Sequence, residues 1–191
     1  MLVFSLGARC TLPGQHSAGR FEDVALPHLP AAYNLARWLV RNDQDAEDVV
    51  QEAYLRAFKF FGGYRGGESR TWLLTIVRNT CYSWLQRNRS RALTDSIDEA
   101  HENLTIDFTN PELRLVQDVD VRIVRESLGE LPLEFREVMV MRELEELSYK
   151  EIAAIADLPI GTVMSRLARG RKRLHTLLAT QMGVQTKGGP Q

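Results

Sequence analysis

Basic side chains are concentrated at one point of the chain, within the segment from Ser148 to Leu174. Residues 166–173 include five arginines and lysines and no acidic residue. At about 100° per residue, a helix here would gather its apolar residues on one stripe, made of Val163, Leu167, Gly170 and Leu174. Its other sides would carry small, hydrogen-bonding and guanidinium groups, the types that contact base edges and phosphates: Ser165, Arg166, Ala168, Arg169, Lys172 and Arg173. These residue types favour recognition of DNA over catalysis.

A second, shorter helix is predicted just before this one. Ser148 and Glu151 have the spacing of a capping box, in which each side chain satisfies the other residue's free backbone donor. Pro159 then ends the short helix, Gly161 gives the backbone freedom, and a second helix runs from Thr162. Two helices joined by a short turn form a helix-turn-helix, whose second helix enters the DNA major groove. The competing interpretation is a basic helix that is only a solvated surface.

Charge is distributed unevenly, although the chain as a whole is nearly neutral. The 191 residues carry 24 basic and 25 acidic side chains, for a net charge of −1. Acidic residues cluster at 42–52 and at 93–113, where basic residues are absent, whereas residues 159–191 hold no acidic residue. Such segregation indicates separate surfaces that contact different partners.

The sequence shows no residue pattern typical of a catalytic or metal-binding site. Cys10 and Cys81 form neither a disulfide framework nor a metal-binding pattern, and the four histidines are scattered. We see no phosphate-binding glycine loop at a strand–helix junction and no catalytic triad pattern, so we expect no catalytic residue, no metal and no cofactor. The first ten residues do not fit a secretion signal, and no run approaches the roughly 18–20 apolar residues of a membrane span. A cytoplasmic protein without membrane insertion is expected.

Helical periodicity elsewhere predicts an all-α protein of two small helical domains. The first, 21–91, would hold helices ending near Arg41, over about Ala46–Phe61 and from Arg70 to about Arg89. Four glycines between 62 and 67 predict a loop before the last of these helices, which Ser69 would cap. The second domain, 118–180, would begin with a helix through Val121, Val124 and Leu128, followed by a helix from Pro132 and the helix-turn-helix. The rest of the chain consists of an extension at 1–20, predicted to be disordered, a flexible acidic linker at 92–117 and a tail at 181–191.

Three segments resemble bacterial sigma factors of the sigma-70 family. The run DAEDVVQEAYLRAF at 45–58 is similar to conserved region 2, and RTWLLTIVRN at 70–79 resembles the promoter-reading and melting helix that follows it. Residues 148–173, with GTV at 161–163 and SRL at 165–167, resemble region 4. A chain of fewer than 200 residues that carries both regions resembles the extracytoplasmic-function (ECF) group, which lacks region 1.1 and a folded region 3.

The resemblance implies a transcription initiation factor that directs core RNA polymerase to the promoters of one regulon, in a stress or envelope response. Region 2 would bind the β′ clamp of polymerase through Asp48, Gln51, Glu52 and Arg56, and region 4 would bind the β flap. Region 2 would also receive the −10 promoter element, through Tyr64, Arg65, Ser69, Trp72, Arg78 and Asn79. Trp72 has a second interpretation as a core residue, because it adjoins the buried stripe. An anti-sigma factor is the expected inhibitory partner.

In the same family the linker passes toward the RNA exit path, which suits an acidic segment, and a solubilising linker is the alternative. The basic helix would contact the −35 element, although Met164 stands where many relatives carry a basic residue. A stand-alone helix-turn-helix regulator is the second hypothesis, but no dimerisation helix is evident. A sigma mimic that sequesters an anti-sigma factor is the third, but such proteins usually add a receiver domain, for which the chain has no room.

Overall fold

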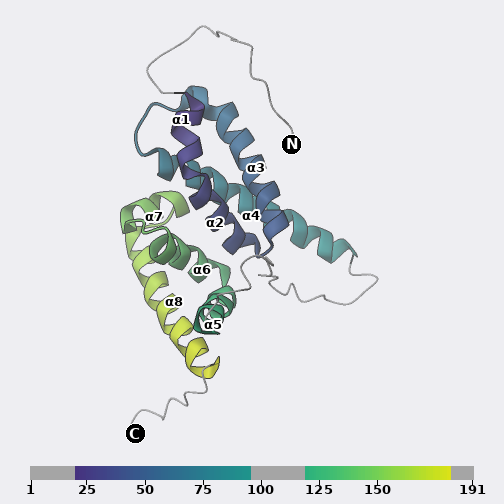
Figure 1. Cartoon of the computed structure of the whole chain (residues 1–191), viewed down its shortest axis with the longest axis vertical. Coiled ribbons are helices and arrows are strands. Elements are labelled where there is room, and N and C mark those ends of the chain that lie inside the picture. Colours follow the sequence, from purple (N-terminus) through teal and green to yellow (C-terminus); the bar gives the residue numbers. More distant parts are fainter. Residues whose placement is uncertain (1–19, 96–118, 182–191) are drawn as a thin grey trace.

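The computed structural model of the chain describes residues 20–95 and 119–181. The predictions for the extension before residue 20, the linker at 96–118 and the tail after Gln181 therefore lie outside the described residues. Within the two described stretches all regular structure is helical, as expected, and it forms two units (Figure 1). The first contains α1 (Phe21–Ala25), η1 (Leu26–His28), α2 (Leu29–Val40), α3 (Asp43–Phe60), η2 (Phe61–Gly63) and α4 (Ser69–Asp95). The second contains α5 (Val119–Gly129), α6 (Leu133–Met139), η4 (Val140–Leu144), α7 (Tyr149–Ala156) and α8 (Ile160–Gln181).

The first unit is built from α2, α3 and α4, which pack against one another through fully buried aliphatic side chains. Helix α2 ends at Arg41, whose backbone is left-handed with φ 65°, and Asn42 then caps α3 by accepting a hydrogen bond from the Asp45 N–H. This cap starts α3 at Asp43, three residues before the predicted start, because polar residues can form a first turn that apolar periodicity does not reveal. The main core residues are Leu35, Leu39, Val49, Ala53, Leu73, Leu74 and Val77.

The glycine-rich loop leads into α4, where the predicted cap and the predicted end of the helix are both wrong. Gly66 and Gly67 have φ values of 86° and 108°, a region that glycine adopts without steric cost. Ser69 does not cap α4 but is its first residue, and its hydroxyl forms a 2.8 Å hydrogen bond with His28 Nε2. Helix α4 continues to Asp95, beyond the predicted end at about Arg89.

The second unit contains the predicted helix-turn-helix, with two corrections in its turn. Both hydrogen bonds of the capping box are present at the start of α7, from Ser148 N–H to the Glu151 carboxylate (2.7 Å) and from Glu151 N–H to the Ser148 hydroxyl (3.3 Å). Asp157, rather than Pro159, ends α7, because it adopts the left-handed conformation at φ 54°. Helix α8 begins at Ile160, so Gly161 lies in its first turn.

Between α6 and α7 the chain makes one turn of π-helix, η4, which the sequence did not predict. Its hydrogen bond runs from Glu145 N–H to the Val140 carbonyl, five residues back, instead of the four of an α-helix. In α5, Leu128 is buried, whereas Val124, at the same helical spacing, is 44% exposed.

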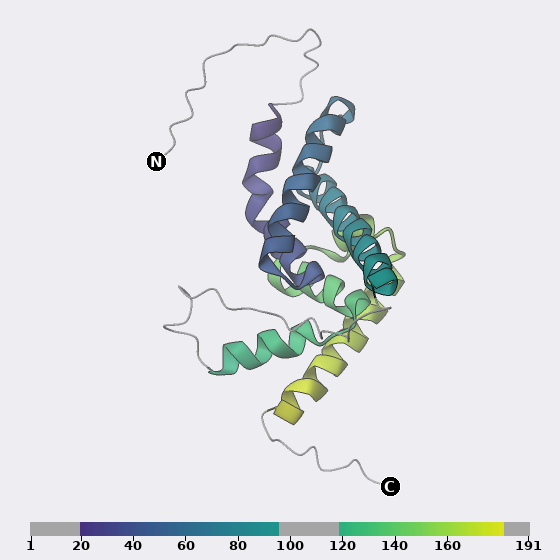
Figure 2. The same ribbon diagram turned by 90° about the vertical axis from the view of Figure 1, so that its right-hand side faces the viewer.

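The two units are in contact, with α6 against α2 and α7 against α4 (Figures 1 and 2). Buried Arg136 of α6 donates to the carbonyls of Gly129 and Leu131 in its own unit and, at 3.5 Å, to that of Leu39 in α2. Burial and the nearby charge of Arg41 lower the pKa of Arg136 to about 10. Helix α8 extends from this contact away from the first unit. In the stretches that the structure describes, no helix combines the length and the apolar character needed to cross a membrane.

Candidate nucleic-acid interface

Helix α8 presents the predicted basic face. Val163, Leu167 and Gly170 are buried against the rest of the unit, and Leu174 is half-buried. A side chain at Gly170 would meet Met139, because an added Cβ would lie 3.0 Å from the Met139 Cγ. The opposite side of the helix carries exposed residues: Met164, Ala168, Arg169, Lys172 and Arg173. Among the described residues, none of the three cations in this set has an ion pair.

Two other arginines of α8 have protein partners. Arg171, on the far side from Arg169, forms hydrogen bonds to Glu143 at 2.8 and 3.1 Å. The Arg166 guanidinium is only 22% exposed and lies 3.1 Å from the Glu137 carboxylate. Ser165 is half-buried, and its hydroxyl donates to the Thr162 carbonyl. The structure therefore exposes Ala168, Arg169, Lys172 and Arg173 together, but holds Arg166 and Ser165 closer to the protein.

The glycine-rich loop of the first unit lies beside a cluster of aromatic rings. Tyr64 stacks on Phe61 with a centroid distance of 5.8 Å and lies 4.9 Å from the Trp72 ring. The Tyr64 hydroxyl donates to the Gly67 carbonyl (2.8 Å), which braces the loop. Trp72 is half-buried and packs on the core, so it has a structural role and still leaves part of its surface accessible. Arg65 and Asn79 are exposed, at this loop and on α4 respectively.

Arg78 on α4 is directed to the second unit instead of to solvent. Its guanidinium lies 3.0 and 3.4 Å from the Glu137 carboxylate and 4.3 Å from the centre of the Tyr82 ring. Burial alone would lower the pKa of Arg78, but the hydrogen bond and charge of Glu137 raise it, so the guanidinium stays charged. Burial and the same carboxylate raise the pKa of Tyr82, which donates to Glu137 at 2.8 Å.

The predicted polymerase-binding residues lie along α3 and divide into two groups. Asp48 and Gln51 are exposed. Glu52 instead accepts hydrogen bonds from Arg56 (2.5 Å) and from Arg87 of α4 (3.0 Å), so it also ties two helices together. Burial would raise the pKa of Glu52, but these two arginines lower it below the usual range.

Next to these polar residues, α3 carries apolar side chains that the sequence analysis did not single out. Leu55 is 67% exposed and Phe58 is 63% exposed. Isolated exposed apolar residues are ordinary, but neighbouring ones on one helix face are typical of a protein contact. They could have been found as apolar residues that fall off the buried stripe of α3.

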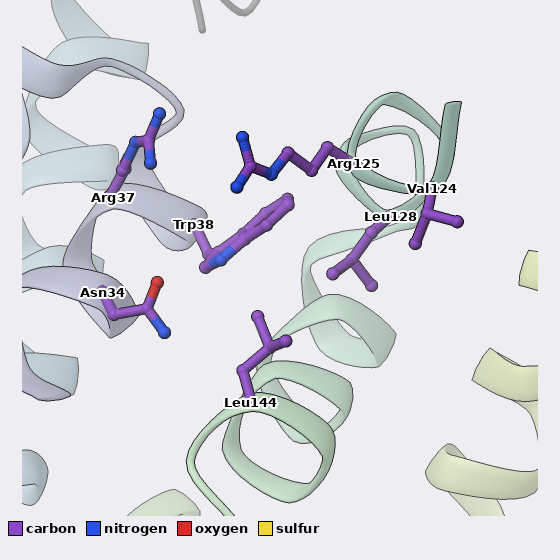
Figure 3. Close-up of a pocket in the computed structure, with 7 residues that line it drawn as sticks. All are labelled: Asn34, Arg37, Trp38, Val124, Arg125, Leu128 and Leu144. Atoms are coloured by element: carbon purple, nitrogen blue, oxygen red, sulfur yellow. The ribbon is translucent and has the colours of Figure 1, made fainter. Parts of the chain in front are cut away.

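A groove of about 570 Å³ separates α2 of the first unit from α5 and η4 of the second. Figure 3 shows the Trp38 ring in its centre, facing Leu128 and Leu144, with Arg37 and Arg125 on one side. Val124 and Asn34 complete its lining. Its walls come from both units, so the groove exists only while the units are together, which explains why sequence patterns within one unit did not reveal it.

Comparison with known proteins gives matches in both units. Residues 25–91 match the family Sigma-70 region 2, and residues 122–174 match Sigma-70, region 4. The chain is 34% identical to the ECF RNA polymerase sigma factor SigE of Mycolicibacterium smegmatis, across 83% of this chain and 62% of that protein, so it spans less than two thirds of this relative. It is 34% identical to the RNA polymerase sigma-H factor of Pseudomonas aeruginosa, across 83% of this chain and 86% of the relative. It is 36% identical to the ECF RNA polymerase sigma-E factor of Escherichia coli K12, across 68% and 72%.

Two solved structures have a similar fold. The sigma factor RpoE of Bartonella quintana, in complex with the anti-sigma factor NepR, has a TM-score of 0.69 and 31% identity, covering 83% of this chain and 96% of that one. CnrH in complex with the cytosolic domain of CnrY has a TM-score of 0.58 at 23% identity, covering 84% and 88%. The first similarity spans both units of this chain.

Proposed function

The chain belongs to the ECF group of the sigma-70 family of transcription initiation factors, and from this premise we propose that it binds core RNA polymerase and selects the promoters of one regulon. In this proposal, residues 118–180 recognise the −35 element and residues 21–91 bind polymerase and open the −10 element. The regulon serves a stress or envelope response, and the protein acts in the cytoplasm. The protein itself catalyses no reaction, because the polymerase supplies the chemistry.

One observation carries the DNA-binding part of the proposal: behind the capped helix α7, α8 exposes Arg169, Lys172 and Arg173, which form no ion pair with any residue that the structure describes. Arg169, Lys172 and Arg173 are free to contact DNA, and Ala168 between them lets the helix approach the base edges. Arg166 and Ser165 complete this −35 surface once their contacts to the protein are released. Met164 lies on the same face without a charge, so it adds surface but no phosphate contact.

The glycine loop and the start of α4 support the −10 assignment. Opening DNA requires the capture of an unstacked base, for which aromatic rings and guanidinium planes are suited. Tyr64 and Trp72 provide rings, and Arg65 provides an exposed guanidinium at the same loop. Asn79 is exposed and available to contact a base edge. Arg78 is available to contact a phosphate after it leaves Glu137. Ser69 lies at the edge of this surface, where its hydroxyl is hydrogen-bonded to His28.

The exposed face of α3 supports the contact with the β′ clamp. Asp48 and Gln51 supply the polar groups that fix the register of an interface, and Leu55 adds exposed apolar area beside them. Glu52 and Arg56 stand at the edge of this face as an ion pair. The contact of residues 118–180 with the β flap follows from the family alone.

An anti-sigma factor is the proposed inhibitor, and the groove between the two units is its proposed docking site. Leu144, which is 45% exposed, offers apolar area to one side of a helix beside the buried Trp38 and Leu128, and Arg125 favours an acidic residue at its edge. Arg37 is already paired with Asp43, at 2.6 Å. The Bartonella relative, which is similar over both units, was solved with an anti-sigma factor bound. A partner seated in this groove would contact both units and hold them together.

The test is reconstituted transcription. Purified chain and core polymerase are incubated with genomic DNA from the source bacterium, and the 5′ ends of the transcripts are sequenced. We expect chain-dependent transcripts whose upstream sequences share two elements, one near −35 and one near −10. Absence of any chain-dependent transcript would refute the assignment, and specific DNA binding without polymerase would favour a stand-alone regulator instead. Run-off transcription from single promoters then gives the cognate −35 sequence.

A further inference from the structure

One exposed row of side chains on α8 begins apolar and ends basic. Ile160, Met164, Ala168 and Lys172 follow one another at intervals of four residues, and all four are exposed. Each interval turns the row by only about 40° around the helix axis, so the row stays on one side of α8 over about 18 Å. Ile160 is 42% exposed and Met164 is 52% exposed. We name Ile160, Met164 and Ala168 the apolar edge of α8.

Packing within the second unit does not account for the apolar edge. The buried side of α8 is formed by Val163, Leu167 and Gly170, which lie about 60–120° from Met164 around the helix. About half of the Met164 side chain therefore stays in water, where it gains nothing from the hydrophobic effect until a partner covers it. Single exposed apolar residues are ordinary, but neighbouring ones with a polar rim are typical of a binding surface.

Charge identifies double-stranded DNA as the partner that covers this edge. Arg169, Lys172 and Arg173 lie beside its C-terminal end, and none of them has an ion pair with a residue that the structure describes. Such a group of cations suits the phosphates of a duplex. In a helix-turn-helix the start of the second helix contacts the base edges, and Ile160 and Met164 are the first and fifth residues of α8.

An apolar side chain in the major groove has one matching group on the bases. The base edges offer hydrogen-bond donors and acceptors there, and the C5 methyl of thymine is the apolar group among them. Met164 against a donor or acceptor would displace water without replacing its hydrogen bond, which costs free energy. Against a thymine methyl, it removes apolar surface from water instead. The unbranched, flexible side chain of methionine adapts its shape to such a contact.

We propose that Met164, flanked by Ile160 and Ala168, is a specificity-determining residue that reads the methyl group of a thymine in the −35 element. This inference rests on the proposed function, because it uses the assignment of α8 to that element. It deepens that function by naming what the uncharged part of the surface recognises. Phosphate contacts of the neighbouring cations position α8 on any sequence, whereas the apolar edge selects among sequences.

Replacement of thymine by deoxyuridine tests the contact, because it removes the methyl group and leaves every hydrogen-bonding group of the base pair. The duplexes carry the −35 sequence identified by run-off transcription, with one thymine replaced at a time on either strand. Fluorescence anisotropy gives the affinity of the full-length chain for each duplex. We expect at least one replacement to weaken binding about fourfold, the factor for one buried group of methyl size. Equal affinity for all duplexes, or a −35 element without an A·T pair, would overturn the proposal.

The variant Met164→Ala identifies the side chain responsible. It should bind the thymine duplex more weakly than the wild type does, and it should no longer distinguish thymine from uracil at the sensitive position. Met164→Leu keeps an apolar side chain of similar size, so it should keep the preference for the methyl group. The matched control is Leu26→Ala, which removes an equally exposed apolar side chain, at 52%, from the first unit and should behave as the wild type. Full methyl sensitivity in a folded Met164→Ala variant would assign the contact to another residue and overturn the proposal.

The same measurements separate this inference from the proposed function. If the wild-type chain binds the −35 duplex no better than a scrambled duplex, the assignment of α8 to that element fails, and the inference fails with it. Specific binding that ignores every thymine methyl refutes the inference alone. If Met164→Ala leaves DNA binding unaltered but weakens association with core polymerase, the apolar edge binds a protein instead.

Discussion

Arginines 169 and 171 lie two positions apart on α8, and they allow the DNA-facing side of the helix to be tested with matched changes. Both side chains are exposed, but Arg169 has no ion pair among the described residues, whereas Arg171 binds Glu143. Two residues correspond to about 200° around a helix, so the two side chains point to nearly opposite sides. Each change to alanine removes one positive charge and introduces the residue with the highest helix propensity.

The expected losses follow from these surroundings. Arg169→Ala should weaken binding to the cognate −35 duplex by about 1–3 kcal/mol, or about 5- to 150-fold, if its guanidinium contacts a base. Arg171→Ala removes an exposed salt bridge that is worth about 0.2–1 kcal/mol of stability. Its charge lies on the far side of the helix, where salt screens it beyond about 8–10 Å, so its effect on DNA affinity should be small.

Fluorescence anisotropy with a labelled duplex, measured over a series of salt concentrations, supplies the affinities. Thermal unfolding monitored by circular dichroism confirms that both variants remain folded. Equal losses for the two variants would refute the reasoning, because only net charge would then matter. If Arg169→Ala weakens binding to all sequences alike and makes the salt dependence shallower by about one ion, Arg169 contacts a phosphate and not a base.

Three further predictions concern other parts of the molecule. Leu55→Glu should weaken association with core polymerase at least about tenfold in a pull-down or interferometry titration, while changing the free energy of unfolding by no more than about 0.5 kcal/mol. The control is Leu26→Glu, at a second exposed apolar residue. Equal effects of the two changes would remove Leu55 from the interface. Ser148→Ala should lower the free energy of unfolding by about 1 kcal/mol in urea denaturation, because the capping box is lost; an unchanged midpoint would contradict the role of the cap. Burial and, to a smaller extent, the charge of Arg70 lower the pKa of His28 below 6.5. Just below pH 6.5 the unfolded chain therefore binds more protons than the folded chain. The free energy of unfolding should fall as the pH falls through that window. His28→Gln should make the melting temperature less dependent on pH there, and an unaltered dependence would assign it to other groups.

The all-α class, the main helices and the buried stripe of α8 followed from the sequence, because apolar residues at helical spacing and a capping pair are local features. The ends of elements were less accurate. Asn42 begins α3 through its side chain, which accepts a hydrogen bond from the Asp45 N–H, and Asp157 ends α7 through a left-handed backbone conformation. Apolar periodicity reveals neither. Serine is a preferred cap residue, but the Ser69 hydroxyl is instead hydrogen-bonded to His28, which is distant in sequence.

The candidate site was predicted as a set of side chains but not as an arrangement. Ala168, Arg169, Lys172 and Arg173 of α8 were placed on the correct exposed face because one helix determines their direction, whereas Ser165 and Arg166 are half-buried. Arg78 and Arg166 were chosen for their charge, and nothing within either helix indicated that a single carboxylate, Glu137, would hold both. Such contacts join segments far apart in sequence, and they depend on how two units meet, which no local pattern encodes.

The π-helical turn at Val140–Leu144 has a consequence for insertions and deletions. A π turn holds one residue more than the α turn it replaces, so the removal of one residue here would restore regular α-helix and rotate everything after it by about 100° relative to α6. Glu145 would then face away from Arg70 and Asn34, although every side chain involved would still be present. Chain length in this segment, more than the identity of its residues, sets the direction of that carboxylate. Relatives that lack the extra residue should therefore join their two domains through different contacts, or not at all.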